Sequence, residues 1–241
     1  MATAVGNIER VDAQTMRLLR LHHPGHGNSI DTAMLVSLLT ALEAPLPARA
    51  LVIEGAGPCF SAGYSLGELQ RFDGTAAAAF CRLAHQAVGV IERWPGVTLA
   101  LVRGPCLGPG LELALACDLI VATPGAQFGL PGLAFGLMPC AGGLRRIAAR
   151  CPPQVMRDIF LNGSTYRSGQ ARSAKLVDRV VPAASAPERL VQRWGRWDES
   201  SVMAIRSLRL ARQGRDEIAL EADLFSAGFL SGDIQDRIAT L

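Results

Sequence analysis

Short apolar runs alternate along this chain with longer amphipathic stretches. The apolar runs have the length of strands and stop at turn-forming or charged residues, whereas the amphipathic stretches follow the 3.6-residue period of a helix. Strands are predicted near residues 8–11 and at residues 15–21, 50–54, 99–102 and 118–122. Helices are predicted at residues 32–42, 75–93, 111–117, 144–150 and 154–161. This alternation predicts an α/β fold with a largely parallel, buried sheet.

Residues 99–143 carry the densest pattern: a strand, a glycine-rich turn, a helix, a second strand and a second glycine-rich turn. Glycines between a strand and a helix let the backbone approach a ligand closely, and the first amides of the helix point toward that ligand. Such a turn stabilises an anion, either a phosphate or the oxyanion of a polarised carbonyl. Glu112 is the one ionisable group in the apolar helix that follows. It is either a functional acid or an acid that compensates the helix dipole.

Four segments of the chain resemble the signature segments of a known family. They read CFSAGYSLGEL (59–69), RGPCLGPGLELALACD (103–118), AQFGLPGLAFGLMPCAGG (126–143) and YRSGQARSAKLVDRVV (166–181). The resemblance is to the crotonase (enoyl-CoA hydratase/isomerase) superfamily and covers nearly the whole chain. It implies a ClpP/crotonase-like spiral of ββα units, with a core domain at residues 1–182 and a C-terminal helical region at residues 183–241. Similar C-terminal helices in the family close over the acyl site and pack trimers, so a homotrimer or a dimer of trimers is expected.

The same resemblance implies the chemistry of the site. Members of the family stabilise an enolate made from an acyl-CoA thioester, and two backbone amides hold the thioester oxygen. The first amide matches that of Tyr64. The adjoining residues that resemble the family's substrate-binding segment are Ala62, Gly63, Ser65 and Leu66.

The second amide of this oxyanion hole falls at Pro109, which has no N–H to donate. Either the loop shifts so that the amide of Gly110 or Gly108 serves, or the Tyr64 amide remains alone. In the second case a side-chain donor such as the Tyr64 hydroxyl compensates.

Hydratases of the family use two glutamates, one as general base and one as general acid. Glu112 matches the first glutamate, but the second falls at Gly132, a position of the substrate-binding region, so one carboxylate is missing. A single carboxylate suits isomerisation, decarboxylation or a modified hydration, with the Tyr64 side chain as the second acid. The rival interpretation is a non-catalytic acyl-CoA-binding protein, and an acyl group bound to a carrier protein stays open as the substrate. No cofactor is expected apart from the CoA of the substrate.

Two further residues match the dehalogenase members of the family. His85 matches their histidine, and Cys140 falls at the position of their nucleophilic aspartate. A thiolate beside a base at a glycine-rich helix start is activated, so a Cys140/His85 pair is one hypothesis. The alternative is a buried core thiol and a surface histidine.

His26, Arg10 and Arg71 are the candidates for binding the phosphates of CoA, with ordinary solvated charge as the alternative for each. His22, His23 and His26 lie close together, but their spacing fits no common metal site. No acidic partner stands near them in the sequence, which predicts solvated loop histidines and no metal.

Composition narrows the class of protein further. A chain of 241 residues with 49% hydrophobic content can bury one large core, and a net charge of +3, evenly spread, does not favour nucleic acid. No run reaches the roughly 18 apolar residues that span a bilayer, and the first residues do not resemble a signal peptide. The six cysteines have no paired metal spacing, which predicts reduced thiols in a cytoplasmic protein.

Overall fold

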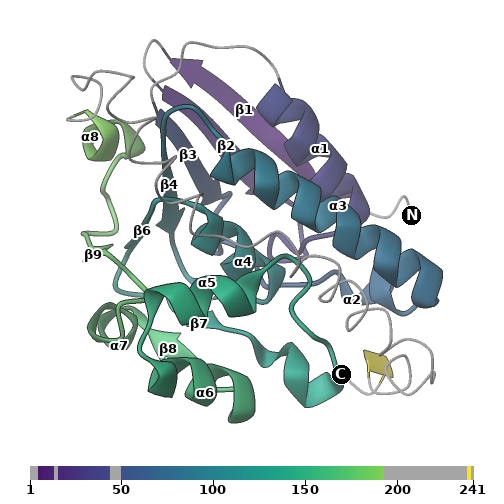
Figure 1. The fold of residues 1–241 in the computed structure, drawn as a ribbon. Helices are drawn as coiled ribbons and strands as arrows, with labels where there is room; N and C mark the ends of the chain where they lie inside the picture. The colour runs from purple at the N-terminus through teal and green to yellow at the C-terminus, as the bar shows by residue number, and fades with distance from the viewer. Residues whose placement is uncertain (1–4, 14–15, 44–49, 193–237, 240–241) are drawn as a thin grey trace.

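The computed structural model describes residues 5–13, 16–43, 50–192 and 238–239, and its largest element is a mixed sheet (Figure 1). In the sheet the strands follow the order β1-β2-β3-β4-β6-β9. Only the first pair is antiparallel. The strands are β1 (Asn7–Ala13), β2 (Met16–His22), β3 (Ala50–Gly55), β4 (Val97–Val102), β6 (Leu119–Ala122) and β9 (Arg179–Val180).

The apolar runs become the central strands because both faces of the sheet are covered. Every residue of β3 and β4 is buried, as expected for parallel strands between two layers. Helices α1 (Thr32–Glu43) and α3 (Gly74–Glu92) lie side by side over one face (Figure 1). On the other face, α8 (Pro187–Val191) contributes Val191 to a separate apolar cluster.

A smaller sheet, of order β5-β7-β8, stands next to the main one. Its strands are β5 (Pro105–Leu107), β7 (Gln127–Gly129) and β8 (Tyr166–Arg167). The remaining helices are α2 (Leu66–Leu69), α4 (Pro109–Ala116), the 3₁₀ helix η1 (Pro131–Phe135), α5 (Gly143–Arg150), α6 (Pro153–Leu161) and α7 (Ser168–Ser173). In the described ranges no helix has both the length and the apolar character that crossing a membrane requires.

The predicted α/β fold with its largely parallel sheet is confirmed, and the predicted elements occur within a few residues of their expected bounds. Among the shifted boundaries, α4 begins at Pro109 rather than at residue 111. Proline is favoured at the first position of a helix, where its missing N–H costs nothing. The helical region predicted for residues 183–241 falls largely on residues 193–237, outside the described residues, so it stays a prediction, as does the boundary at residue 182.

Candidate active site

Three loops meet at one edge of the main sheet. They follow β2, β3 and β4, whose carboxyl ends lie together because these strands are parallel. Two isolated bridges join the loops, one between Ile30 and Tyr64 and one between Ser61 and Cys106. The FSAG segment (residues 60–63) is therefore held between the loop that follows β2, here called the histidine loop (residues 22–31), and the glycine-rich turn.

The first of these bridges orients the Tyr64 amide. The Ile30 N–H donates to the Gly63 carbonyl (2.7 Å), and the Ser65 N–H donates to the Ile30 carbonyl (3.0 Å). In such a pairing the amide of the middle residue faces the opposite way. The Tyr64 N–H is thus directed away from Ile30, as a donor to a bound ligand must be.

The turn before α4 shows which amides the helix start offers. Gly108 has a φ of +51°, which favours glycine, and its N–H donates to the Gly129 carbonyl (3.0 Å). The prediction that Gly108 supplies an oxyanion donor is therefore wrong, because its proton is already used in the smaller sheet. The first bond of the helix runs from the Glu112 N–H to the Gly108 carbonyl (3.1 Å). Since Pro109 has no N–H, Gly110 provides the first amide of the helix start.

Glu112 is fully buried, and both of its carboxylate oxygens accept backbone hydrogen bonds. Oε1 accepts from the amides of Ala141 and Gly143, each at 2.8 Å, and Oε2 accepts from the amide of Cys140 at 3.2 Å. Successive amides that converge on one carboxylate at a helix start form an anion nest, here at the beginning of α5. The carboxylate therefore compensates the start of α5 rather than that of its own helix.

The Tyr64 ring lies next to this nest. A Cβ placed on Gly108 would be 3.7 Å from the ring, so the ring passes directly over the turn. The hydroxyl donates to the Met138 carbonyl (3.2 Å) and is hydrogen-bonded to the Cys140 side chain. Burial, followed by the proximity of Cys140 and Glu112, raises the pKa of Tyr64 well above its usual value. The phenol therefore stays protonated at neutral pH.

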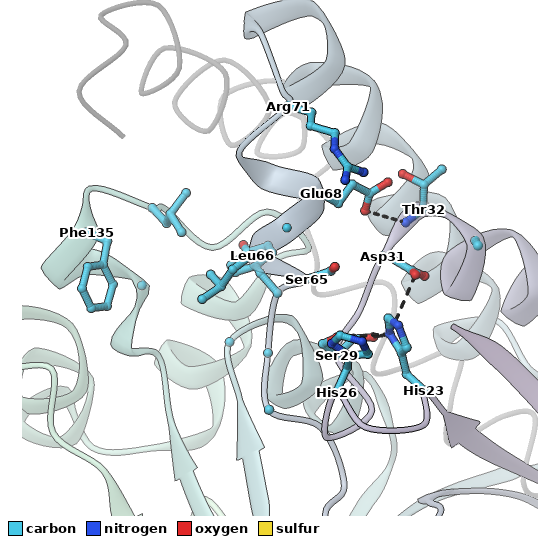
Figure 2. Close-up of a pocket in the computed structure, with 18 of the residues that line it drawn as sticks. His23, His26, Ser29, Asp31, Thr32, Ser65, Leu66, Glu68, Arg71 and Phe135 are labelled. Atoms are coloured by element: carbon cyan, nitrogen blue, oxygen red, sulfur yellow. Dashed lines mark hydrogen bonds and ion pairs between the residues drawn. The ribbon is translucent and has the colours of Figure 1, made fainter. Parts of the chain in front are cut away.

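A cavity of about 890 Å³ opens along these loops. Figure 2 shows a polar group on one side, including His23 and Glu68, and Phe135 on the other, with Ser65 and Leu66 between them. The predicted site residues that line this cavity are His26, Ala62, Gly63, Tyr64, Ser65, Leu66, Arg71, Gly108 and Gly132. Glu112 is not among the residues that line it, whereas Tyr64, which interacts with the carboxylate, is.

The histidine loop is less solvated than predicted. His23 is only 3% exposed and lies 3.8 Å from the Asp31 carboxylate, and His22 pairs with Glu9 at 2.9 Å. The expectation of solvated histidines without acidic partners is therefore wrong for these two. Ser29 Oγ and Asp31 both approach Nδ1 of His23, whereas a hydrolytic triad needs them on opposite ring nitrogens. Among the described residues no group of three or more metal-ligating side chains is found.

The Cys140/His85 pair predicted from the dehalogenase resemblance is not formed. Nδ1 of His85 contacts the carbonyl (3.0 Å) and sulfur (3.6 Å) of Cys81, one turn earlier on α3. Cys140 is fully buried, and that burial raises the pKa of its thiol well above the usual value. A thiolate nucleophile requires the opposite shift, so Cys140 is the buried core thiol of the alternative interpretation.

Of the three predicted CoA-binding side chains, two lie at the cavity and one does not. His26 and Arg71 line the polar side. Arg10 is on the edge strand β1, where it pairs with Asp12 at 3.2 Å, and it does not line the described cavity. Sequence reasoning missed Asp31 and Glu68, which cap the start of α1 by accepting from the Met34 and Thr32 amides. The run Asn-Ser-Ile-Asp (residues 28–31) predicts a helix start at Asp31. It does not predict that Asp31 lines the cavity.

The chain contains two tyrosines, and both should titrate unusually late. The hydroxyl of Tyr166 donates to Asp158 (2.6 Å), which raises the pKa of Tyr166 to about 12, and the pKa of Tyr64 is raised as well. We expect tyrosinate absorbance to appear only above pH ~11 in the folded protein and near pH ~10 in concentrated guanidinium chloride. Because the unfolded chain ionises first, stability should decline as the pH rises beyond ~10. A folded-state transition near pH ~10 would contradict the environments described for both phenols.

Comparison with known proteins identifies the family to which the chain belongs. The family model for enoyl-CoA hydratase/isomerase matches residues 12–236, so the chain belongs to that family. Among curated proteins, the 2,3-dehydroadipyl-CoA hydratase of Escherichia coli K12 is 32% identical over 214 residues, which cover 88% of this chain and 83% of the relative.

Solved structures agree on the fold. An enoyl-CoA hydratase/isomerase from Mycobacterium paratuberculosis superposes with a TM-score of 0.89 at 23% identity, covering 98% of each chain. DspI from Pseudomonas aeruginosa gives a TM-score of 0.80 at 28% identity over 88% of this chain and 84% of its own. The fold is thus crotonase-like, as the signature segments predict.

Proposed function

We propose that this chain processes acyl-CoA thioesters by stabilising a thioester enolate, as a hydratase-like enzyme with one carboxylate. The observation that carries the proposal is that the outward-facing Tyr64 amide and the first amides of α4 lie beside the Gly108 turn. The Glu112 carboxylate is buried next to the Tyr64 side chain. Two amide donors next to a helix start are what a developing oxyanion requires. The names of the relatives, several of them hydratases of acyl-CoA substrates, support the same class of substrate.

The acid and base roles fall to different groups in this proposal. Glu112 is the base, because its carboxylate lies next to Tyr64 and three amide donors fix its position. The Tyr64 hydroxyl is the acid, because it is protonated at neutral pH and lies next to Glu112 and the Gly108 turn. The Tyr64 ring must shift from the turn for Glu112 to reach the α-carbon of a bound thioester. This division replaces the missing carboxylate at Gly132.

The cavity suggests how the thioester lies. Its polar side, with His26 and Arg71, suits the phosphates of CoA, and its apolar side, with Phe135 and Leu137, suits the acyl chain. The thioester carbonyl would then fall between the two sides, beside Tyr64. A homotrimer or a dimer of trimers remains the expected assembly.

A second function, binding of acyl-CoA without chemistry, is favoured by one observation. Both oxygens of Glu112 are engaged and the carboxylate does not line the cavity. Titration calorimetry with CoA and butyryl-CoA, run beside a turnover assay on crotonyl-CoA, separates the two functions. The proposal expects binding together with loss of the enoyl absorbance. Binding with no turnover across a panel of enoyl- and acyl-CoA thioesters would select the binding protein instead.

A further inference from the structure

The loop that forms the anion nest around Glu112 makes hydrogen bonds on two sides, to the Glu112 carboxylate on one and to side chains of α3 and α5 on the other. Its amides at residues 140, 141 and 143 face the carboxylate, while two of its carbonyls face the other way. The Cys81 thiol, from α3, donates to the Cys140 carbonyl (3.0 Å). The guanidinium of Arg146, from α5, donates through Nη1 to the Ala141 carbonyl.

Arg146 is itself fixed by a buried ion pair. Its Nε donates to Oε1 of Glu92, the last residue of α3, at 2.8 Å, and the two side chains are 6% and 9% exposed. The guanidinium lies against Gly142, where an added Cβ would be 2.5 Å from Nη1. Gly142 also has a φ of +81°, a conformation that favours glycine. Both the backbone and the close approach of Arg146 therefore require a residue without a side chain at position 142.

From this geometry we infer that Glu92 and Arg146 are positioning residues for the Glu112 carboxylate, acting through the backbone of the loop at residues 140–143. The inference rests on the proposed function, in which Glu112 is the base. Neither side chain lines the described cavity, so neither is a substrate-binding group. The pair links the end of α3 to the start of α5, and the loop between Met138 and Gly143 is what this link holds in place.

The energetics favour a positioning role over a stabilising one. Burying two charges costs several kcal/mol in desolvation, and replacing such a pair by apolar residues of similar volume is often neutral for stability. A misplacement of about 1 Å at a reacting group, in contrast, costs on the order of 10²-fold in rate. The loop geometry should therefore depend on the pair more strongly than the stability of the fold does.

The test uses the double variant Glu92→Met/Arg146→Met in the full chain, with Glu92→Gln as a milder second variant. We expect the double variant to keep a thermal midpoint near that of the parent, while kcat on crotonyl-CoA falls at least ~10-fold and KM changes less than ~3-fold. Amide hydrogen exchange of residues 140–143 should accelerate at least ~10-fold, since the hydrogen bond from Arg146 to the Ala141 carbonyl is lost. Glu92→Gln should lower kcat in the same direction.

Arg150→Met provides the matched control. Arg150 is on the same helix, one turn beyond Arg146, and pairs with Asp178 instead of the loop. It should leave kcat and the exchange of residues 140–143 unchanged. A parental kcat in the double variant, with or without faster exchange, would overturn the inference.

A parent protein without turnover would instead count against the proposed function. Amide exchange at residues 140–143 then decides the inference alone. Faster exchange in the double variant supports the positioning role of Glu92 and Arg146, and exchange at the parental rate refutes it.

Discussion

Replacing Glu112 by Gln should lower kcat on crotonyl-CoA by about 10²–10⁴-fold, the range that a positioned acid–base group contributes. The side chain keeps its size, so the cavity and KM should change little. The amide also has one oxygen in place of two, and its NH₂ group would face amides that now donate to the carboxylate. We therefore expect a loss of about 1–3 kcal/mol in the free energy of unfolding as well, measured by denaturant titration.

Glu68→Gln is the control for this prediction, because Glu68 is a carboxylate that does line the cavity. Its Oε2 accepts from the Thr32 amide at the start of α1. Its kcat should stay within about threefold of the parent, since no proton transfer is assigned to it. If Glu68→Gln abolished turnover while Glu112→Gln did not, the wrong carboxylate would have been assigned as the base.

Tyr64→Phe should lower kcat by roughly 10²-fold with little change in KM, because it removes the proposed acid and keeps the ring over the turn. The lost hydrogen bond to the Met138 carbonyl should cost about 1 kcal/mol of stability. Steady-state kinetics on crotonyl-CoA across pH 6 to ~9 measures the effect. The parent should show no alkaline loss from this phenol in that range, since the pKa of Tyr64 is raised.

Tyr166→Phe is the matched control, since Tyr166 is the other tyrosine of the chain. Tyr166 lies on β8, and its hydroxyl donates to Asp158 of α6 rather than to a group of the Glu112 nest. It should lower stability without a change in kcat. Equal losses of kcat in the two variants would mean that Tyr64 acts through structure alone, and an unchanged kcat in Tyr64→Phe would remove it from the mechanism.

Most of the fold was accessible from the sequence because burial on both faces leaves an unmistakable pattern. The runs ALVIE and LALV become fully buried central strands, and the amphipathic helix at residues 75–93 corresponds to α3. The ends of helices and strands were harder to predict where one residue suits both a turn and a helix start. The proline at residue 109 reads as part of a turn, but in the structure it is the first residue of α4.

The candidate site was predicted in part. The contact between the FSAG segment and the glycine-rich turn followed from the family motifs, although 45 residues separate Ser61 from Cys106. Contacts that no motif carries did not follow, because partner choice depends on packing. The Glu112 carboxylate meets amides 28 to 31 residues away, and nothing in the local sequence marks that meeting. For the same reason His85 was paired with Cys140, whereas the helix places it against Cys81.

The most direct test of the account is exchange of the α-hydrogens of butyryl-CoA with D₂O, followed by mass spectrometry. A saturated thioester cannot be hydrated or isomerised, so exchange reports formation of the enolate alone. The account predicts deuterium incorporation by the parent protein and its loss in Glu112→Gln. Binding of butyryl-CoA with no deuterium in the recovered thioester would contradict it.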